Sequence, residues 1–453
     1  MATAVDTLVP TAKTTEAQIP FGLKFYWSVG ASGVAFMMNV IAGFAFFYMI
    51  SVLKISPALA GAIVFVPKIF DAFTDPIVGS WSDRLKTDKS RRRPFLLAGA
   101  ILSSLSFLMV FTTPMLGHEY MTIGYIFTAL MLFSFGYTLF NIPYLAMPAE
   151  MTDSYHERSS IHSFRMISVS TAGVLAAGIP LILEQLGRTS WTAYALVGLG
   201  GAAFIFVTLM TTWLGTANAR FLSTSAERPN LMKEMRAVLG NKHFMRLIGA
   251  KFCQLLGTAA TIAAFKFFVL SVMQRDFTVI TYYFLLISAC SIIAAPLTVQ
   301  VSKVLGKNWT YVIAAIANVL TVASWSLAQP GEPTWAILLR GVGLAIAFSG
   351  NVVMAMSMLT DIINHDAKQT GVRREGVFTS FYSFVEKFTF AFGPLLIGVA
   401  LSLAGFDKSL PAEQQTGDDV RQALLLGVSY IPAVMGLVTI FLLAGYKLKE
   451  TDV

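Results

Sequence analysis

Charged side chains are scarce in this sequence. Of its 453 residues, 13% are Asp, Glu, Lys or Arg, about half of the roughly 25% that is usual in soluble domains. Hydrophobic residues make up 55% and the mean hydropathy is +0.67, so the chain has more apolar side chain than one core of this size can bury. This composition excludes a soluble enzyme and predicts that most of the chain lies in lipid.

Cysteine and histidine are also rare. The two cysteines, Cys253 and Cys290, both lie in apolar stretches, which excludes a disulfide framework and the four ligands of a structural zinc site. The five histidines lie mainly in predicted loops, and the sequence has neither a His-Glu-x-x-His nor a Gly-x-Ser-x-Gly motif. We therefore expect no cofactor and no intramembrane enzyme, while a sensor that binds a solute without moving it stays open.

Long apolar runs are abundant. Twelve of them reach the length of about 20 residues that crosses the hydrocarbon core of a bilayer as an α-helix. They are too long and too uniformly apolar for the strands of a membrane barrel. The predicted fold class is therefore an all-α polytopic membrane protein with twelve transmembrane helices. The expected spans are 25–50, 57–82, 94–116, 120–147, 163–186, 191–214, 244–271, 278–302, 308–329, 334–360, 376–404 and 421–446.

Basic residues gather on one side of these spans. Alternating sides along the chain places 22 of the 33 Lys and Arg residues on the side of both termini and 5 on the other side. Cytoplasmic loops carry such an excess, so we expect both termini in the cytoplasm and the protein in the cytoplasmic (inner) membrane. This placement explains the net charge of +8 without a nucleic-acid partner. Six basic residues fall inside or at the edges of spans: Lys68, Arg165, Lys251, Lys266, Arg340 and Lys387.

Polar stretches divide the chain into two halves. The longest connection, 215–243, contains the helix-breaking sequence Glu-Arg-Pro-Asn at 227–230. The first 20 residues lack the basic-then-apolar order of a signal peptide. The expected organisation is a disordered cytoplasmic tail at 1–20, an N-terminal six-helix bundle at 21–214, a cytoplasmic linker at 215–243, a C-terminal six-helix bundle at 244–446 and a cytoplasmic tail at 447–453.

A short internal repeat supports this division. Both copies close the second span of their half, as a duplicated six-helix unit predicts. Transporters built from such pseudo-symmetric repeats bind their substrate between the two units, near the middle of the membrane. The residues Pro76, Ser82, Asp83 and Leu85 recur as Pro296, Ser302, Lys303 and Leu305, shifted by 220 positions.

The second span carries two acids. Asp71 and Asp75 lie four residues apart, and therefore on one helical face, with Lys68 one turn before them. A charge inside a span costs roughly 2.5–3.5 kcal/mol, so such residues mark ion paths or paired supports. Two carboxylates that face one cavity suit Na⁺ or share one proton. The alternative is that Lys68 neutralises Asp71, and that Asp75 caps an interrupted helix before Pro76.

Basic residues of other spans are candidate partners for these acids. Lys387 in the eleventh span is the expected counter-charge if both spans line a central cavity. The alternative is a local arrangement in which Glu386 and Lys387 face different helices. Arg165, in the fifth span, either lines the cavity or holds Glu150 or Asp153 at the membrane surface.

The fourth span adds neutral polar groups. Thr138 and Asn141 lie three residues apart, share a face, and carry oxygen atoms that can bind a cation. The alternative is a polar seam between packed helices. We assign Tyr137 of this stretch to the cavity, although the many aromatic residues of the eleventh span, Tyr382 among them, favour packing over a platform for substrate.

Two motifs make the chain similar to a known family. The sequences Gly-Ser-Trp-Ser-Asp-Arg at 79–84 and Arg-Arg-Arg-Pro at 91–94 resemble the loop motif of the major facilitator superfamily. The fuller sequence Asp-Ala-Phe-Thr-Asp-Pro-Ile-Val-Gly at 71–79 resembles the glycoside–pentoside–hexuronide:cation symporters, typified by melibiose permease. The similarity extends over nearly all of the chain after the tail. It implies a fold of two pseudo-symmetric six-helix bundles.

The residue patterns and this resemblance together predict roles for individual residues. The resemblance itself implies the cation-site role of Asp71, Asp75 and Thr138, the coupling role of Lys387 and the gate. The cation site consists of Asp71, Asp75, Thr138 and Asn141, with Asp71 and Asp75 as the metal ligands if the cation is Na⁺. The coupling network and substrate cavity consist of Lys68, Tyr137, Arg165, Tyr382 and Lys387. The cytoplasmic gate consists of Gly79, Asp83, Arg84 and Arg92.

Three positions depart from melibiose permease. An aspartate of its first span aligns with Ala35, an acid of its fourth span with Asn141, and a tryptophan with Leu145. Galactoside recognition therefore does not carry over, and the cation stays open between Na⁺ and H⁺.

We expect a cation-coupled secondary transporter that imports a sugar, glycoside or related small organic solute by alternating access. The alternative is Na⁺-coupled transport of a lysolipid or another amphipathic solute. The expected partners are the solute, a monovalent cation and the lipid bilayer, with no nucleic acid and no obligate protein partner.

Overall fold

The structure is a computed structural model that describes residues 19–84, 92–114, 117–152, 155–217, 219, 231–371 and 374–446. All regular secondary structure in these ranges is helical. The α-helices are α1 (Phe21–Val40), α2 (Phe46–Ser51), α3 (Pro57–Arg84), α4 (Arg93–Phe111), α5 (Glu119–Met151), α6 (Tyr155–Ala177), α7 (Ile179–Leu186), α8 (Trp191–Gly215), α9 (Leu231–Gly240), α10 (Lys242–Phe267), α11 (Phe277–Leu305), α12 (Lys307–Ala323), α13 (Thr334–Thr370), α14 (Glu375–Leu403), α15 (Asp418–Leu425) and α16 (Ile431–Ala444).

Five short turns of other helix types continue or join these elements. Three are π-helical, η1 (Ile41–Ala45), η2 (Phe268–Val272) and η5 (Leu426–Tyr430), and two are 3₁₀ turns, η3 (Ser324–Leu327) and η4 (Ala412–Gln414). The π turns continue α1, α10 and α15 without breaking the helical path.

The described residues contain twelve helices that are long and apolar enough to cross a membrane, as the sequence predicts. They are Phe21–Ser51, Pro57–Ser82, Arg93–Phe111, Glu119–Pro148, Ser160–Leu186, Trp191–Gly215, Lys242–Val272, Phe277–Leu305, Lys307–Leu327, Thr334–Thr370, Gly376–Leu403 and Asp418–Ala444. The all-α polytopic class is confirmed.

Three boundaries differ from the prediction. The third span ends at Phe111 because two threonines and Pro114 follow it. The tenth span continues as helix to Thr370, ten residues beyond the predicted limit of 360, because no helix breaker precedes Gly371 at φ 70°. The connection at 215–243 contains α9, so it is helical in part; the predicted tails lie almost wholly outside the described residues.

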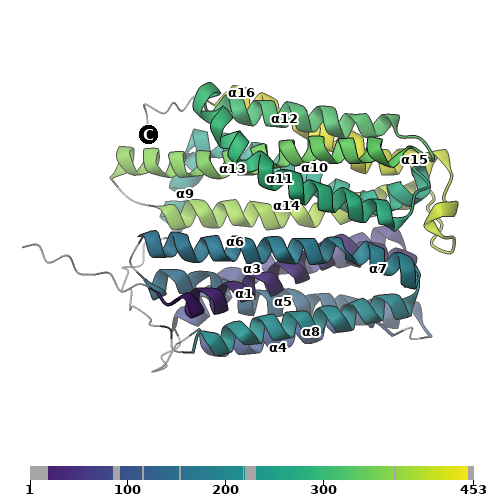
Figure 1. Ribbon diagram of the computed structural model, residues 1–453, viewed down its shortest axis with the longest axis horizontal. Coiled ribbons are helices and arrows are strands. Elements are labelled where there is room, and N and C mark those ends of the chain that lie inside the picture. Colours follow the sequence, from purple (N-terminus) through teal and green to yellow (C-terminus); the bar gives the residue numbers. More distant parts are fainter. Residues whose placement is uncertain are drawn as a thin grey trace, which may run out of the picture.

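The helices form two halves that lie against each other (Figure 1). In the first half, α4 packs on α5 and α8, while α1 packs on α6 and α8; in the second half, α10 packs on α14 and α16, and α13 on α11 and α12. The main contact between the halves is that of α3 with α14. The second and eleventh spans, which carry the predicted acids and Lys387, therefore meet at the interface between the halves.

Small residues allow this close contact. A β-carbon on Gly398 of α14 would lie 2.2 Å from the carbonyl oxygen of Pro57, and one on Gly61 of α3 would lie 2.5 Å from that of Pro394. Both distances are below van der Waals contact, so the two backbones touch only because these positions are glycine.

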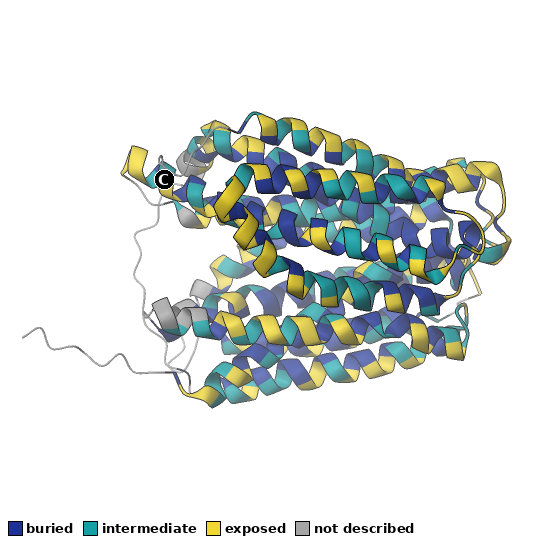
Figure 2. Ribbon diagram, turned by 45° about the horizontal axis from the view of Figure 1, so that its top comes forward, coloured by how far each residue is buried: buried dark blue, intermediate teal, exposed yellow. Residues whose placement is uncertain are grey.

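Burial separates inner spans from outer ones, and Figure 2 shows exposed residues along the full length of several helices. In the first and seventh spans 72% and 78% of the central residues are buried, against 11% in the eighth. The exposed residues of the eighth span include Ile292, Ile293 and Leu297, whose apolar side chains suit contact with lipid.

Equivalent residues of the internal repeat make equivalent contacts. The Ser82 hydroxyl donates to the carbonyl oxygen of Gly79 at 2.9 Å, and the Ser302 hydroxyl donates to that of Val299 at 2.8 Å. Both donor and acceptor are shifted by 220 positions, which agrees with a duplicated unit.

The two ends of the molecule differ in how the halves are joined. Both ends of the described chain lie at one end of the molecule, which we call the terminal end (Figure 1). At the opposite end, the far end, ion pairs join the halves: Arg188 Nη1 lies 2.8 Å from Glu413 Oε1, and Lys408 Nζ lies 2.6 Å from Glu119 Oε1. The ion pairs that the described residues form at the terminal end stay within one half: Lys24–Glu157, Lys307–Asp361 and Arg374–Asp366.

Candidate cation and substrate site

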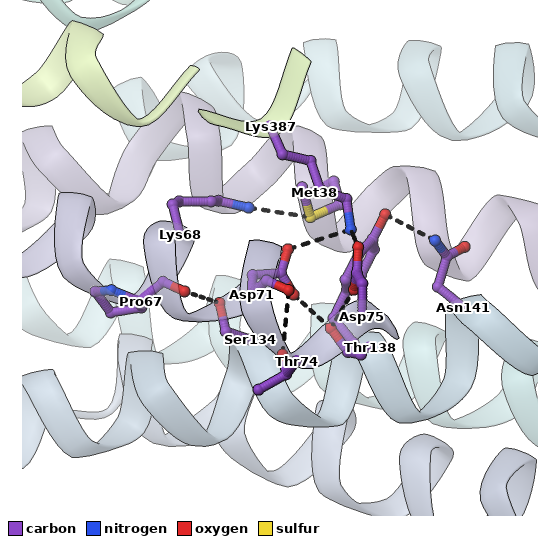
Figure 3. A network of polar contacts seen from close by, with 11 residues as sticks. Met38, Pro67, Lys68, Asp71, Thr74, Asp75, Ser134, Thr138, Asn141 and Lys387 are labelled. Carbon is purple, nitrogen blue, oxygen red and sulfur yellow. Dashed lines mark hydrogen bonds and ion pairs between the residues drawn. The ribbon is translucent and has the colours of Figure 1, made fainter. Parts of the chain in front are cut away.

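The two acids of α3 meet a hydroxyl of α5 in the interior of the first half (Figure 3). Thr138 Oγ1 lies 2.5 Å from Asp71 Oδ1 and 2.9 Å from Asp75 Oδ1. Asp71 and Thr138 are almost fully buried. One turn earlier on α5, the Ser134 hydroxyl donates to the carbonyl oxygen of Pro67 at 3.1 Å, which fixes α5 against α3 at this level.

The single hydroxyl hydrogen of Thr138 limits how it can bond to the two carboxylates. A threonine hydroxyl has one hydrogen, so it donates only one full hydrogen bond. The second short contact is satisfied by a hydrogen shared between both acids, by a proton on one of them, or by a cation among the three oxygen atoms. The arrangement therefore has the chemistry of a site for one monovalent cation or one proton.

Lys387 of α14 reaches this cluster across the interface between the halves. Its ammonium group forms a short ion pair with Asp75 Oδ2 and lies 3.5 Å from Asp71 Oδ2. The ring of Tyr137 lies beside it, with its centroid 5.4 Å from Lys387 Nζ. One charged group of the second half thus contacts both acids of the first half, as the sequence predicts for a central cavity.

Two of the local alternatives for these residues can be compared with the geometry. Helix α3 continues through Pro67 and Pro76 to Arg84, so Asp75 does not cap an interrupted helix. Glu386 and Lys387 do face different helices: Glu386 Oε1 lies 3.3 Å from Lys251 Nζ of α10, while Lys387 meets the acids of α3.

Two other predicted members lie close to the cluster. Lys68 Nζ lies 3.6 Å from Met38 Sδ and 6.0 Å from the centroid of the Tyr137 ring. The Asn141 amide donates to the Tyr137 hydroxyl at 3.1 Å. The structure thus places the Asn141 amide on Tyr137, and among the described residues it makes no hydrogen bond to Asp71 or Asp75. Its role as a cation ligand stays a prediction.

The remaining cavity candidates lie apart from the two acids. Arg165 of α6 lies beside the hydroxyl group of Tyr144; Asp153, one of its suggested partners, lies outside the described residues. Tyr382 of α14 is buried, with its ring centroid 5.4 Å from Lys251 Nζ. Tyr382 therefore belongs to the Lys251–Glu386 pair and not to the acids.

The predicted gate is described only in part. A β-carbon on Gly79 would lie 3.5 Å from Ile142 Cγ2, so α3 and α5 are close there. Arg92 is buried at the start of α4. The side chains of Asp83 and Arg84 lie outside the described residues, and the gate stays a prediction.

Sequence reasoning missed the pair of Lys251 with Glu386. Both residues lie inside predicted spans, which is a signal that each needs a partner. Their pairing depends on the packing of α10 against α14, and helical periodicity within one span does not show which spans are neighbours.

Comparisons with known proteins agree with this geometry. The sequence model of a family described as "MFS/sugar transport protein" matches residues 26–450. A putative glycoside/cation symporter of Escherichia coli (strain K12) is 24% identical, over 95% of this chain and 92% of its own. A glucuronide carrier protein homolog of the same organism is 25% identical, over 93% and 90%.

Among solved structures, the D-xylose-proton symporter is similar to the whole chain. Its crystal structure gives a TM-score of 0.66 at 14% identity, and the match covers 96% of this chain and 99% of that one. At this identity the likeness shows the fold alone.

Proposed function

The chain belongs to the MFS/sugar transport protein family, as a transporter of the glycoside/cation symporter type, and we propose that it moves a sugar or glycoside together with one cation by alternating access. The observation that carries this proposal is the contact of Lys387 with Asp71 and Asp75, because it joins the two halves at a buried site for one cation. The proposed site of action is the cytoplasmic membrane, with both termini in the cytoplasm.

The cation site is proposed to be the three oxygen atoms of Asp71, Asp75 and Thr138. A cation that binds there competes with Lys387 for the same two carboxylates, since all of them lie within one cluster. Binding therefore releases the lysine, whose ammonium group becomes available to the solute. This exchange is the coupling free energy that symport requires between the two ligands.

The solute is proposed to bind between the halves, next to Lys387 and Tyr137. Relatives that are named as glycoside and glucuronide carriers favour a sugar over the amphipathic alternative. Ala35 and Leu145 leave the positions of the melibiose permease sugar site without polar groups, so the sugar is held by other residues.

The described arrangement is closed at the far end by the Arg188–Glu413 and Lys408–Glu119 pairs. With both termini in the cytoplasm, this corresponds to an inward-facing state. Import then requires that these pairs separate and that the halves rock about the contact of α3 with α14.

Counterflow into proteoliposomes tests the proposal. Proteoliposomes that contain the purified protein are loaded with one member of a panel of glycosides, uronides and lysolipids. Uptake of the labelled solute is then measured with and without an inward Na⁺ or H⁺ gradient, at constant ionic strength. We expect accumulation of at least one sugar that depends on one of the two gradients. Accumulation of lysolipids alone, or sugar flux that is independent of both gradients, would contradict the proposal.

A further inference from the structure

The fifth membrane span is not one continuous helix. Helix α6 ends at Ala177 and α7 begins at Ile179, with Gly178 between them. Pro180 lies in the first turn of α7, where its ring leaves a carbonyl oxygen of the preceding turn without a helical donor. The last 8 residues of the span therefore form a separate segment, α7, which lies at the far end of the molecule (Figure 1).

This segment carries an acid to the other half of the molecule. The N–H group of Phe277, the first residue of α11, donates to Glu184 Oε2 at 3.0 Å. The N–H groups in the first turn of a helix have no acceptor inside the helix, and a negative charge is favourable there. Glu184 of the first half thus caps a helix of the second half, and α7 packs on α11.

The second half also holds this helix start by its own contacts. Asp276 Oδ1 accepts a hydrogen bond from the N–H group of Val279 at 3.3 Å, so one carboxylate of each half caps the same turn. Just before this turn, the Arg275 N–H group donates to the carbonyl oxygen of Val269 at 3.0 Å. The start of α11 therefore moves with the second half when the halves separate, and the contact that must break is the one made across the halves.

The same oxygen atom of Glu184 also positions an arginine. Arg188 Nε lies 3.3 Å from Glu184 Oε2, and Arg188 Nη1 lies 2.8 Å from Glu413 Oε1 of the second half. Glu184 thus holds the guanidinium group in the direction of Glu413. One oxygen atom of α7 takes part in two links between the halves, a direct link to α11 and a second link through Arg188.

Water reaches these two links unequally. The far end contains a cavity of about 430 Å³ whose lining, among the described residues, does not include Glu184. The Glu184 side chain is 23% exposed, against 38% for that of Glu413. Exposed ion pairs contribute little to stability, so we infer that the cap by Glu184 is the stronger of the two links. The cavity is lined by Arg188, Gln274, Arg275, Asp276 and Glu413.

We propose that Glu184 is a positioning residue for the closure of the far end. It caps α11 while the far end is closed and loses this contact each time the far end opens, when water replaces its carboxylate at the N–H group of Phe277. Loss of Glu184 therefore shifts the carrier toward the open far end without touching the oxygen cluster of Asp71 and Asp75. The inference rests on the alternating access of the proposed function, in which the far end opens.

Distance measurements between the halves test the inference. Nitroxide labels on Tyr120→Cys and Leu410→Cys, both at exposed positions of the far end, report its opening in a parent chain with Cys253 and Cys290 replaced by alanine. Double electron–electron resonance on the full chain in nanodiscs, without solute, gives the ratio of short to long distances. We expect short distances to dominate in the parent. Glu184→Ala should lower the ratio roughly tenfold or more, the effect of a lost hydrogen bond to a charged group.

Three further variants separate the cap from other roles of the side chain. Glu184→Gln keeps an oxygen acceptor for the N–H group of Phe277 and removes the charge, so it should retain most of the closed population. Asp276→Ala removes the cap that α11 receives from its own half. It should lower the melting temperature and leave the distance ratio unchanged. Glu184→Leu repeats the test with an apolar side chain that suits a membrane span, should the alanine variant not fold.

The outcomes bear on this inference separately from symport. An unchanged distance ratio in Glu184→Ala would overturn it, and so would an equal shift in Asp276→Ala. A Glu184→Gln variant that opens as far as the alanine variant would also overturn it, because the cap would then not be what holds the far end closed. Failure of cation-dependent counterflow by a protein whose far end opens as expected would overturn the proposed symport and leave the role of Glu184 standing.

Discussion

Asp71 and Asp75 share one hydroxyl group, which sets them apart from the other acids whose side chains the structure describes. The spacing of four residues places both on one face of α3, and Thr138 of α5 contacts them together. Both acids also contact the same lysine, Lys387 of α14. Together with Thr138 they form a small oxygen cluster whose charge changes when one cation or proton binds.

Replacement of Asp75 by asparagine should separate folding from coupling. The amide has the shape of the carboxylate but not its charge, so Lys387 loses its closest partner and the cation loses one ligand. We expect normal insertion and abundance, and cation-dependent accumulation at the level of empty vesicles. Uptake assays with the proteoliposomes described above measure both; a variant that retains the full gradient dependence would contradict the assignment.

Thr138 allows a test of the hydroxyl itself. Thr138→Val keeps the shape of the side chain and removes the oxygen atom, which leaves the buried Asp71 with fewer partners. We expect a large rise in the cation concentration for half-maximal uptake, about tenfold or more for a lost hydrogen bond to a charged group. Thr138→Ser should restore it. Equal behaviour of the valine and serine variants would show that the hydroxyl takes no part.

The sequence predicts some of these contacts and not others. The spacing of four residues is sufficient to predict that Asp71 and Asp75 share a helical face. The need for a positive charge opposite them suggests Lys387 as their partner. The position of Asn141 was not predictable in the same way, because a spacing of three residues defines a face but not its tilt toward a neighbour. The structure turns its amide to Tyr137.

The spans themselves follow from local composition. Length, apolar character and the preference of a lipid-exposed backbone for internal hydrogen bonds predict all twelve of the described membrane helices. Continuity through Pro67 and Pro76 was harder to predict, since proline breaks most helices in water. In this chain α3 is held between α5 and α14, and packing on both sides favours a continuous helix over a break.

The contact of α3 with α14 depends on glycine, which gives a prediction for these elements. In Gly398→Ala the new methyl group would collide with the carbonyl oxygen of Pro57. We expect a loss of about 1–3 kcal/mol, as for other overpacked sites, seen as a melting temperature several degrees lower in detergent. The control is Gly200→Ala on α8, where a β-carbon meets nothing within 4 Å. Equal melting temperatures for the two variants would contradict the close contact.

At the scale of the whole molecule, two similar halves meet along α3 and α14 and are joined by ion pairs at the far end. The division into six and six spans was predictable from the long polar connection and from the repeat at 76–85 and 296–305. The end at which ion pairs join the halves was not predictable, because these pairs connect segments that are distant in sequence, such as Glu119 with Lys408.

Chemical crosslinking of the far end tests this closed state. Cysteines at Arg188 and Glu413, in a chain with Cys253 and Cys290 replaced by alanine, would place one thiol on each half. We expect a short thiol crosslinker to stop transport and its reductive cleavage to restore it. Cysteines at Lys307 and Asp361, which pair within the second half, should crosslink without loss of transport. Full transport by the crosslinked first pair would mean that the far end does not open.

The far-end ion pairs also make the contact between the halves sensitive to the salt concentration of the surrounding medium. Arg188, Glu413, Lys408 and Glu119 are partly exposed, and at physiological ionic strength the screening length is about 8 Å. A higher salt concentration therefore weakens the ion pairs that join the two halves at the far end. If the far end opens during transport as proposed, salt concentration is then expected to change how readily it opens, independently of the oxygen cluster between α3 and α5.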